Sequence, residues 1–238
     1  MTFSTLSRRE RLRAATIDEI KTTARRLLVQ DGLPAVSLRA IGREIGMTGP
    51  ALYRYFAGLA DLIAALGADL YDECREHLEA ARDACGSDDP GTRMYAVSRA
   101  FRAWSVAHPA EFGLIFAAPI GVAVEADPAT PQPNAAGRRF VGVFAALFIE
   151  IWRTRPFPVP DGAGVAIGLG DLLWTHLGAP DAELPRGAAQ LFLSCWIRLY
   201  GMVCMEVFGH LRFAVEDAEP VFEAELAAIA QQLGLPPQ

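Results

Sequence analysis

The sequence of 238 residues predicts an all-α protein. Apolar residues recur at helical spacing along nearly the whole chain. No stretch keeps the alternation of period two that is typical of a strand, and clusters of Gly and Pro separate the helical segments. The composition, 52% hydrophobic and 21% charged, supports a folded core and excludes a chain that is disordered in bulk.

The first predicted helix has a single apolar face, which consists of Ile17, Ile20, Ala24, Leu27 and Leu28. Gly32 follows this face and is expected to end the helix. Four arginines precede the face, Arg8, Arg9, Arg11 and Arg13. They form either a basic arm that reaches a minor groove of DNA or a disordered, soluble terminus.

Residues 37–56, SLRAIGREIGMTGPALYRYF, predict two short helices joined by a tight turn. Ser37 stands where its hydroxyl can cap the first of them. Leu38, Ile41 and Ile45 give that helix one apolar face. Gly46 falls where the helix is expected to stop, and the chain then turns.

The second short helix has its own start signals. Thr48 suits the N-cap, and Pro50 suits the first turn, where its missing N–H is no loss. Leu52 and Phe56, four residues apart, are expected to face inward. Two short helices with this spacing are typical of a helix-turn-helix, whose second helix enters the major groove of DNA.

The rest of the chain predicts further helices. The longest covers residues 59–84 and ends before a break at 86–91. We expect a proline-rich loop at 118–134 and a turn at 155–160. The remaining predicted helices are 92–107, 110–117, 138–154, 164–177, 186–208 and 220–233.

Contacts with duplex DNA are expected from Ser37, Arg39, Thr48, Gly49, Pro50, Ala51, Tyr53, Arg54 and Tyr55. Arg54 is the candidate for reading a guanine, because its fork matches O6 and N7. Tyr53 and Tyr55 are assigned mainly to phosphate, with Tyr55 also near bases, and Thr48 serves as both cap and phosphate donor. The small residues allow close approach to the groove, while Ser37 and Arg39 reach the backbone. The alternative is a purely structural role, in which the tyrosines are partly buried and the arginines are solvated surface charges.

The charge is distributed unevenly, although the net charge is −6. Residues 1–58 contain ten basic and five acidic residues, a balance of +5. Residues 59–238 contain twelve basic and twenty-three acidic residues, a balance of −11. A basic end on an acidic body indicates a protein that touches phosphate with one end only.

Residues 16–66 resemble the N-terminal domain of TetR-type bacterial transcriptional regulators. The resemblance depends on three features in order: a first helix that ends in Asp31-Gly32, a helix at 37–45 followed by Gly46-Met47-Thr48, and the run 51–56 before a helix containing Asp61-Leu62-Ile63. A looser resemblance to one C-terminal subtype covers residues 196–210 together with 108–112. Together the two resemblances imply a DNA-binding domain at 1–66 and a ligand-binding and dimerisation domain at 67–238, with the boundary inside the long helix.

The resemblance also implies a function. Such a regulator is a homodimeric repressor that binds a pseudo-palindromic operator and is released by a small apolar effector. One position departs from the family pattern, because Leu59 stands where many members have a Lys at the start of a helix. The phosphate contact of that Lys is either missing or supplied by backbone amides at the helix start.

The implied effector site is expected among aromatic residues of the larger domain. The candidates are Trp104, His108, Phe112, Phe116, Phe144, Phe148, Trp152, Trp174 and Tyr200, with His176 as a further orienting group. Each of them singly is better explained as ordinary core packing.

The implied dimer surface lies on the last two long helices. Its candidates are Leu191, Trp196, Tyr200, Val203, Val207, Phe222, Leu226, Ile229 and Leu233. Their spacing alone also fits helices that pack in the core of one chain.

The sequence does not support a metalloprotein, an enzyme with a known catalytic motif, or a secreted or membrane protein. The four cysteines form no C-x-x-C pair, the four histidines are scattered, and no catalytic or phosphate-binding motif is present, so we expect no metal, cofactor or catalytic residue. No signal peptide is evident, and the apolar stretch 187–208 contains charges that disfavour a membrane span, which predicts a cytoplasmic protein. The alternatives are an enzyme with an aromatic helical pocket, or an interaction protein that has lost DNA binding.

Overall fold

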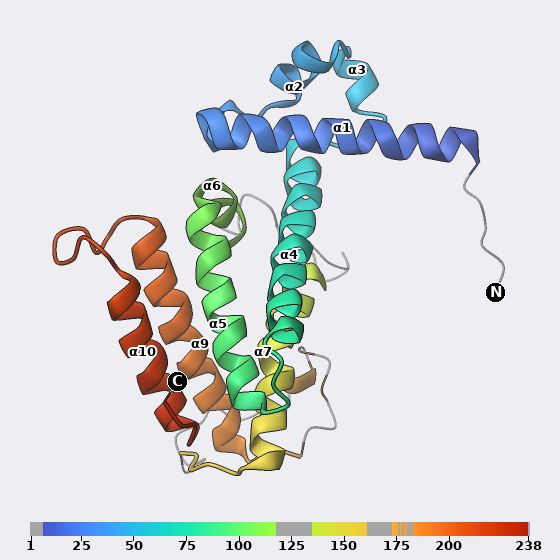
Figure 1. The fold of residues 1–238 in the computed structure, drawn as a ribbon. Helices are drawn as coiled ribbons and strands as arrows, with labels where there is room; N and C mark the ends of the chain where they lie inside the picture. The colour runs from blue at the N-terminus through green and yellow to red at the C-terminus, as the bar shows by residue number, and fades with distance from the viewer. Residues whose placement is uncertain are drawn as a thin grey trace. The chain divides into compact units, whose positions relative to one another are not determined.

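The computed structural model describes residues 7–117, 135–160, 173–175, 177, 179 and 183–237. These residues form helices and contain no strand, which confirms the predicted all-α class (Figure 1). A 3₁₀ turn, Leu33–Ala35, follows the first helix, and a π-helical turn, Gly113–Ala117, follows α6. The α-helices are α1 Arg8–Asp31, α2 Leu38–Ile45, α3 Gly49–Leu52, α4 Leu59–Ala84, α5 Pro90–Ala107, α6 Pro109–Phe112, α7 Ala135–Thr154, α9 Arg186–Val207 and α10 Glu219–Gln232.

The predicted boundaries agree closely with the observed ones where both are available. The long helix α4 covers the predicted residues. Helix α9 ends one residue before the predicted end, and α10 begins and ends one residue earlier than predicted. Helix α5 begins two residues early because the Asp89 carboxylate accepts a hydrogen bond from the Thr92 amide at 2.8 Å, with Pro90 in the first turn. The predicted loop at 118–134 and most of the predicted helix at 164–177 lie outside the described residues.

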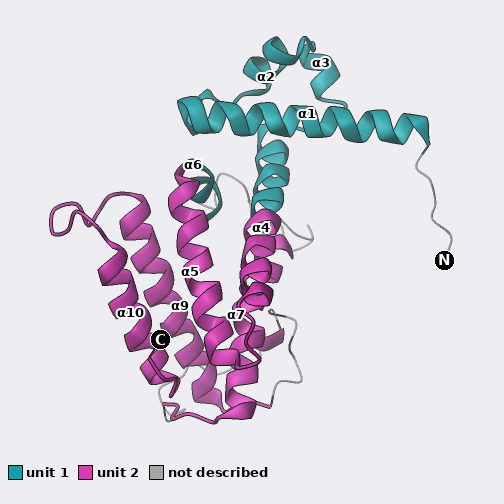
Figure 2. Cartoon of the chain, viewed as in Figure 1, with its two compact units in different colours: residues 1–70, 110–134 teal, residues 71–109, 135–238 magenta. Residues whose placement is uncertain are grey.

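The chain divides into two compact units (Figure 2). Unit 1 comprises residues 1–70 and 110–134, and unit 2 comprises residues 71–109 and 135–238. Helix α4 therefore contributes to both units, and the segment after α5 returns to unit 1. The boundary expected between residues 66 and 67 remains a prediction about which part folds independently.

The core of unit 1 joins the two short helices to α1 and the start of α4. Leu52 and Phe56 face inward as predicted, with Leu52 fully buried. Leu114, from the π-helical turn, enters the same core. The buried cluster consists of Ile20, Ala24, Leu27, Leu28, Val36, Ile41, Leu52, Phe56, Leu62, Leu66, Leu70 and Leu114. This core holds the helix-turn-helix on a rigid base.

Unit 2 is a helical bundle in which α5 packs against α7, α9 and α10. Phe101 of α5 is fully buried at its centre. Its ring centre lies 5.5 Å from that of Phe140, 6.1 Å from that of Phe144 and 5.8 Å from that of Trp196. Ring pairs at these separations add to the stabilisation that burial alone provides.

Helix α9 is apolar enough to resemble a membrane span by length and composition, with a mean hydropathy of 1.3 over its most apolar window. However, 44% of that window is buried inside the structure. Core helices satisfy the same length and composition test, and α9 has packing partners in α5 and α10. The structure therefore agrees with the expectation of a buried helix.

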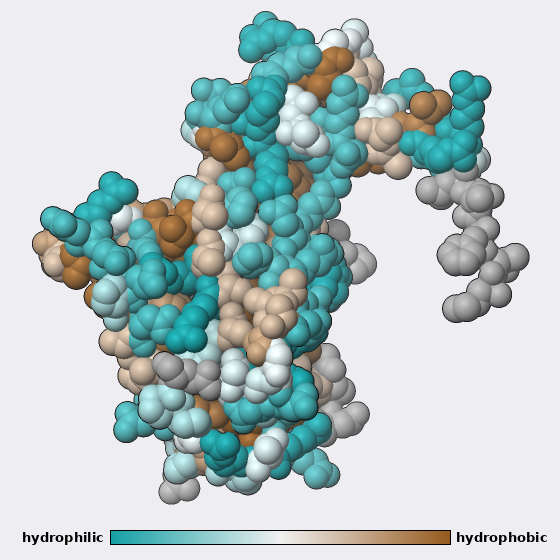
Figure 3. Space-filling view, viewed as in Figure 1, coloured by the Kyte–Doolittle hydropathy of each residue, from teal (hydrophilic) through white to brown (hydrophobic). Residues whose placement is uncertain are grey.

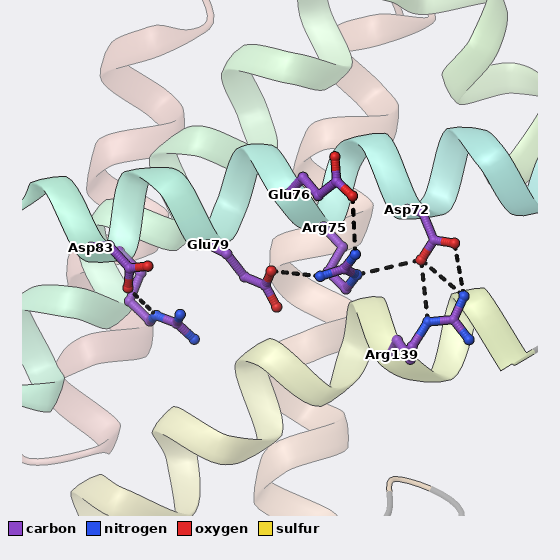
Figure 4. Close-up of polar contacts among 7 residues, drawn as sticks. Asp72, Arg75, Glu76, Glu79, Asp83 and Arg139 are labelled. Carbon is purple, nitrogen blue, oxygen red and sulfur yellow. Dashed lines mark hydrogen bonds and ion pairs between the residues drawn. The ribbon is translucent and has the colours of Figure 1, made fainter. Parts of the chain in front are cut away.

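An ion-pair network joins α4 to α7 within unit 2 (Figure 4). The Arg139 guanidinium donates to both carboxylate oxygens of Asp72, at 2.8 and 2.9 Å. Arg75 contacts the same carboxylate at 3.4 Å and also pairs with Glu79. The hydrogen bond from Arg139 is the main cause that holds the pKa of Asp72 below its ordinary value of 3.8.

This lowered pKa predicts an acid-dependent loss of stability. The charged form of Asp72 is favoured in the folded state, so its contribution is present at neutral pH and is lost as the pH falls through the folded pKa. We expect Asp72→Asn to destabilise unit 2 by about 1 kcal/mol or less at pH 7, because the pair is partly exposed. The four tryptophans all lie in unit 2, so urea unfolding followed by their fluorescence reports on it. The difference between the variant and the parent should close below pH 3.8, and a constant difference would contradict this account.

Candidate DNA-binding surface

The start of α1 is a capped helix, and this corrects the alternative of a disordered terminus at residues 8–13. The Ser7 hydroxyl accepts a hydrogen bond from the Glu10 amide at 3.3 Å. The Glu10 carboxylate in turn accepts one from the Ser7 amide at 2.7 Å. Such a capping box satisfies amides that a helix start otherwise leaves without partners. The four arginines therefore stand on a regular helix.

The turn of the helix-turn-helix is fixed by two glycines. Gly46 ends α2 in the left-handed conformation, with φ of 70°. A Cβ atom on the buried Gly42 would lie 2.7 Å from the Met47 carbonyl oxygen, so a larger residue would push the turn away. The Ser37 hydroxyl accepts from the Ala40 amide at 3.1 Å, as predicted for the cap of α2. The sequence predicted the roles of Gly46 and Ser37 but gave no signal for Gly42.

The conformation of Gly46 predicts a specific cost. No atom lies within 4 Å of a Cβ built on it, so Gly46→Ala tests the backbone alone. We expect unit 1 to lose about 1 kcal/mol, because an L-residue is disfavoured in the left-handed region. Amide hydrogen exchange in α2 measures this, since unit 1 contains no tryptophan. Gly49→Ala, at an equally open position without positive φ, is the matched control and should not lose stability.

Helix α3 is shorter than predicted. It covers Gly49–Leu52, and residues 53–55 continue as turns rather than as α-helix through Phe56. The Tyr55 amide donates to the Leu52 carbonyl at 2.9 Å, a tighter i to i+3 pattern. Thr48 occupies the N-cap, but its side chain makes no capping hydrogen bond. Its carbonyl oxygen accepts from the Ala51 and Leu52 amides instead.

We call residues 48–55 the reading segment, because most of the predicted DNA contacts lie in it. Tyr53 is 61% exposed, Arg54 is exposed and Tyr55 is half-buried. Thr48, Gly49 and Pro50 are exposed and Ala51 is half-buried. Arg39 is exposed on α2, and Ser37 is half-buried at the start of that helix. All nine residues thus belong to unit 1, and the reading segment brings seven of them together.

Arg13 is a residue that the sequence analysis did not connect with this segment. Its Nη1 donates to the Arg54 carbonyl oxygen at 3.1 Å. Its guanidinium carbon lies 5.1 Å from the centre of the Tyr55 ring, a cation–π contact. The two contacts attach the end of the reading segment to α1. Forty-one residues separate Arg13 from Arg54, so no local pattern reveals the pairing.

The start of α4 departs from the expected phosphate site. Leu59 is 40% exposed and offers no charge. The Asp61 carboxylate accepts a hydrogen bond from the Ala57 amide at 2.9 Å. This amide is therefore already occupied, and the acidic group beside it disfavours an anion at that point.

The predicted effector residues do not gather around one pocket. Phe144 and Phe148 line an apolar cavity of about 40 Å³ inside unit 2. Trp104 instead stacks on His108 and donates to Glu73 at 3.2 Å. The other candidates pack elsewhere: Phe112 against Phe116 in unit 1, Trp152 against Phe157, Trp174 against Phe148 and Phe192, and Tyr200 against Trp196. His176 lies outside the residues whose side chains are described.

The cavity is lined mainly by residues that the sequence analysis did not assign to a ligand. Leu199, Leu226 and Leu233 come from α9, α10 and the residue after α10. Cys195 also lines it, and burial raises the pKa of this thiol to about 11, so it remains protonated at neutral pH. The lining is almost wholly apolar, and Ser98 is among its few polar members.

Most of the predicted dimer residues pack the interior of unit 2. Trp196, Tyr200 and Val207 are half-buried. Helical spacing identified the apolar face of each helix correctly, but that face covers the core of its own chain. Outward positions on the same two helices are Ile197, Met205 and Val221, which are 65%, 41% and 38% exposed. The buried residues are Leu191, Val203, Phe222, Leu226, Ile229 and Leu233.

Comparison with known proteins agrees with this architecture. Residues 20–66 match the family described as bacterial regulatory proteins, tetR family, and residues 94–229 match the tetracyclin repressor-like C-terminal domain. The HTH-type transcriptional regulators Rv1816 of Mycobacterium tuberculosis (strain ATCC 25618 / H37Rv) and Mb1846 of Mycobacterium bovis are each 29% identical over 232 residues, covering 91% of this chain and 90% of theirs.

Solved structures extend the agreement to the fold. The crystal structure of SCO4313 is 32% identical, with a TM-score of 0.70, and the match covers 94% of this chain and 98% of that one. A protein of unknown function from Rhodococcus sp. RHA1 shares the fold over both full chains, with a TM-score of 0.67 at 19% identity. The helix-turn-helix on its buried core, the helical bundle of unit 2 and these matches together show that the chain belongs to the TetR family of helix-turn-helix transcriptional regulators, which is not a family of enzymes.

Proposed function

We propose that the protein is a homodimeric repressor that acts in the cytoplasm, binds a pseudo-palindromic operator through its reading segment, and is released by a small apolar effector. The observation that supports the proposal most directly is the exposure of Tyr53 and Arg54 on a segment held by a buried core. An exposed guanidinium on a fixed base is suited to base-edge recognition, which requires a defined approach to the groove.

Each residue of the surface has a role in this proposal. Arg54 donates to O6 and N7 of a guanine, and the hydroxyls of Tyr53 and Tyr55 donate to phosphate oxygens. Thr48 is free to donate to phosphate because its side chain makes no capping hydrogen bond. Gly49, Pro50 and Ala51 allow close approach, and Ser37 and Arg39 contact the adjacent backbone.

In this proposal the protein binds as a dimer, because a pseudo-palindromic operator has two half-sites. One chain carries one reading segment, and two such segments read half-sites about 34 to 36 Å apart on a duplex. In this proposal the outward residues of α9 and α10, Ile197, Met205 and Val221, meet their symmetry mates. The inward residues of these helices stabilise the protomer.

An effector in this proposal enters the apolar cavity of unit 2. Typical small-molecule sites measure about 300 to 1,000 Å³, whereas this cavity measures about 40 Å³. Binding must therefore widen the space that Leu226 and Leu233 share with α5, α7 and α9. An effector that prefers the widened state shifts the population away from the one that binds DNA.

Selection of the purified protein against a random duplex library tests the proposal. About physiological salt is required, because non-specific phosphate binding is weakened there. We expect enrichment of a pseudo-palindrome with two half-sites. Folded protein that enriches no sequence would contradict DNA reading, and enrichment of a single half-site would contradict the dimeric mode.

A further inference from the structure

A basic groove lies in unit 1 beside the reading segment. Its volume is about 490 Å³. One wall is formed by the first turns of α1, from Arg8 to Thr16, and the other by Arg54 and Tyr55. The sequence pattern did not predict that the start of α1 and the reading segment would line one groove.

The positive charge of the groove is concentrated on one face of α1 and is not neutralised by acidic residues in its lining. On α1, Arg8 and Leu12 are four residues apart, as are Arg9 and Arg13, which places them on one face of the helix. With Arg54 the groove has four arginines, and no acidic residue lines it. The guanidinium groups of Arg8, Arg9 and Arg54 form no ion pair with any residue that the structure describes. The start of α1 is accordingly mostly hydrophilic in the space-filling view (Figure 3).

The acidic residue nearest in sequence does not neutralise this face. Glu10 is part of the capping box, where its carboxylate accepts a hydrogen bond from the Ser7 amide. Hydrogen bonds from Ser7 hold the pKa of Glu10 below its ordinary value, so it stays in the charged, capping form at neutral pH. The same capping box makes the arginine-bearing turns helical and so sets the spacing of their side chains.

Arg13 connects the two walls of the groove. Helix α3 ends at Leu52, so the carbonyl group of Arg54 has no partner within a continuing α-helix. The hydrogen bond from Arg13 satisfies this carbonyl, and its guanidinium also covers the Tyr55 ring. The walls are thus held together before any ligand arrives, which reduces the ordering that binding requires.

We propose that the basic groove binds the phosphate backbone of the duplex next to the base-reading site, with Arg8 and Arg9 as phosphate contacts and Arg13 as a positioning residue. This inference rests on the proposed function, since it assumes that the reading segment approaches DNA. Guanidinium forks bind phosphate oxygens in pairs, and duplex DNA presents these anions at regular spacing. Arg54 belongs to both the groove and the reading segment. A DNA strand whose bases contact the reading segment therefore has its backbone next to the groove.

The first test measures the salt dependence of binding for Arg8→Ala/Arg9→Ala in the full chain. Fluorescence anisotropy with the selected operator and with a scrambled duplex, from 50 to about 200 mM salt, gives the slope of log K against log salt for each. Loss of two phosphate contacts should reduce the slope by about 2 and weaken both duplexes by the same factor. Arg153→Ala/Arg186→Ala removes the same charge at exposed positions of unit 2 and should keep the parent slope.

The outcomes separate the groove from the proposed function. If the parent protein prefers the operator but Arg8→Ala/Arg9→Ala keeps the parent slope, or loses no more than the control variant, the groove proposal is overturned alone. If the parent binds operator and scrambled duplex equally, the proposed function fails, while a reduced slope on the scrambled duplex still supports the groove.

A second test isolates the role of Arg13. Arg13→Ala should lower the ratio of operator to scrambled affinity, because the reading segment loses its attachment, whereas Arg8→Ala/Arg9→Ala should leave that ratio unchanged. Hydrogen exchange at the Tyr55 amide should become faster in Arg13→Ala, with exchange in the α1 core unaltered. A parent ratio and parent exchange in this variant would overturn the positioning role.

Discussion

Arg54→Ala is expected to lower affinity for the selected operator about 10- to 100-fold at physiological salt, because a guanidinium paired with a guanine provides about 1 to 3 kcal/mol of discrimination. The loss should be concentrated at one base pair of each half-site, where the variant becomes indifferent to sequence. The side chain of Arg54 is exposed, so the substitution leaves the unit 1 core intact. Titration against a panel of operators with single base-pair changes measures both effects.

Two further variants sharpen this test. Adding Tyr53→Phe removes an exposed hydroxyl at the adjacent position and should weaken all duplexes further without changing the preference. Arg186→Ala removes one exposed charge in unit 2 and is the matched control. Parent operator affinity in the folded double variant Tyr53→Phe/Arg54→Ala would show that the reading segment has been assigned incorrectly.

Arg25→Met is expected to destabilise unit 1 by about 1.5 to 3 kcal/mol, the range for a lost hydrogen bond to a charged group. Arg25 of α1 donates to the Glu111 carboxylate at 3.1 Å, and Glu111 is only 4% exposed. The substitution leaves this carboxylate buried without its partner. Leu114, three residues later, lies in the core of unit 1, so the pair helps to hold the returning segment there.

A double variant identifies the cause of that loss. Arg25→Met/Glu111→Leu removes both charges and should recover much of the stability, because replacing a buried pair with apolar residues is often close to neutral. Hydrogen exchange of α1 amides reports on unit 1, which lacks tryptophan. Equal stability of Arg25→Met and the double variant would mean that the buried carboxylate is not what Arg25 compensates.

The local features of the fold were predictable because their causes are local. Ser37 and Gly46 mark the ends of α2 through hydrogen bonding and backbone conformation that neighbouring residues determine. The inward positions of Leu52 and Phe56 follow from helical spacing. The capped start of α1 was also present in the sequence as Ser7 and Glu10 at the spacing of a capping box, although the arginines around it suggested an arm.

The features that escaped prediction depend on residues far apart in the sequence. Arg13 meets Arg54 and Tyr55 only after folding has brought the turn that follows α3 against the start of α1. The apolar faces of α9 and α10 were identified, but spacing cannot tell a face that covers the protomer core from one that meets a partner. The aromatic residues proved to be spread over several clusters rather than one pocket, since a pattern along one helix does not show which helices will be neighbours.

Reading of a specific duplex sequence through the helix-turn-helix is the basis of the proposed function. The most direct measurement compares the affinity of the full-length protein for the selected operator with that for a scrambled duplex of the same length and composition, at physiological salt. We expect the operator to bind at least about a thousandfold more tightly than the scrambled duplex, with two protomers per duplex. Equal affinity for the two duplexes, with the protein folded, would contradict it.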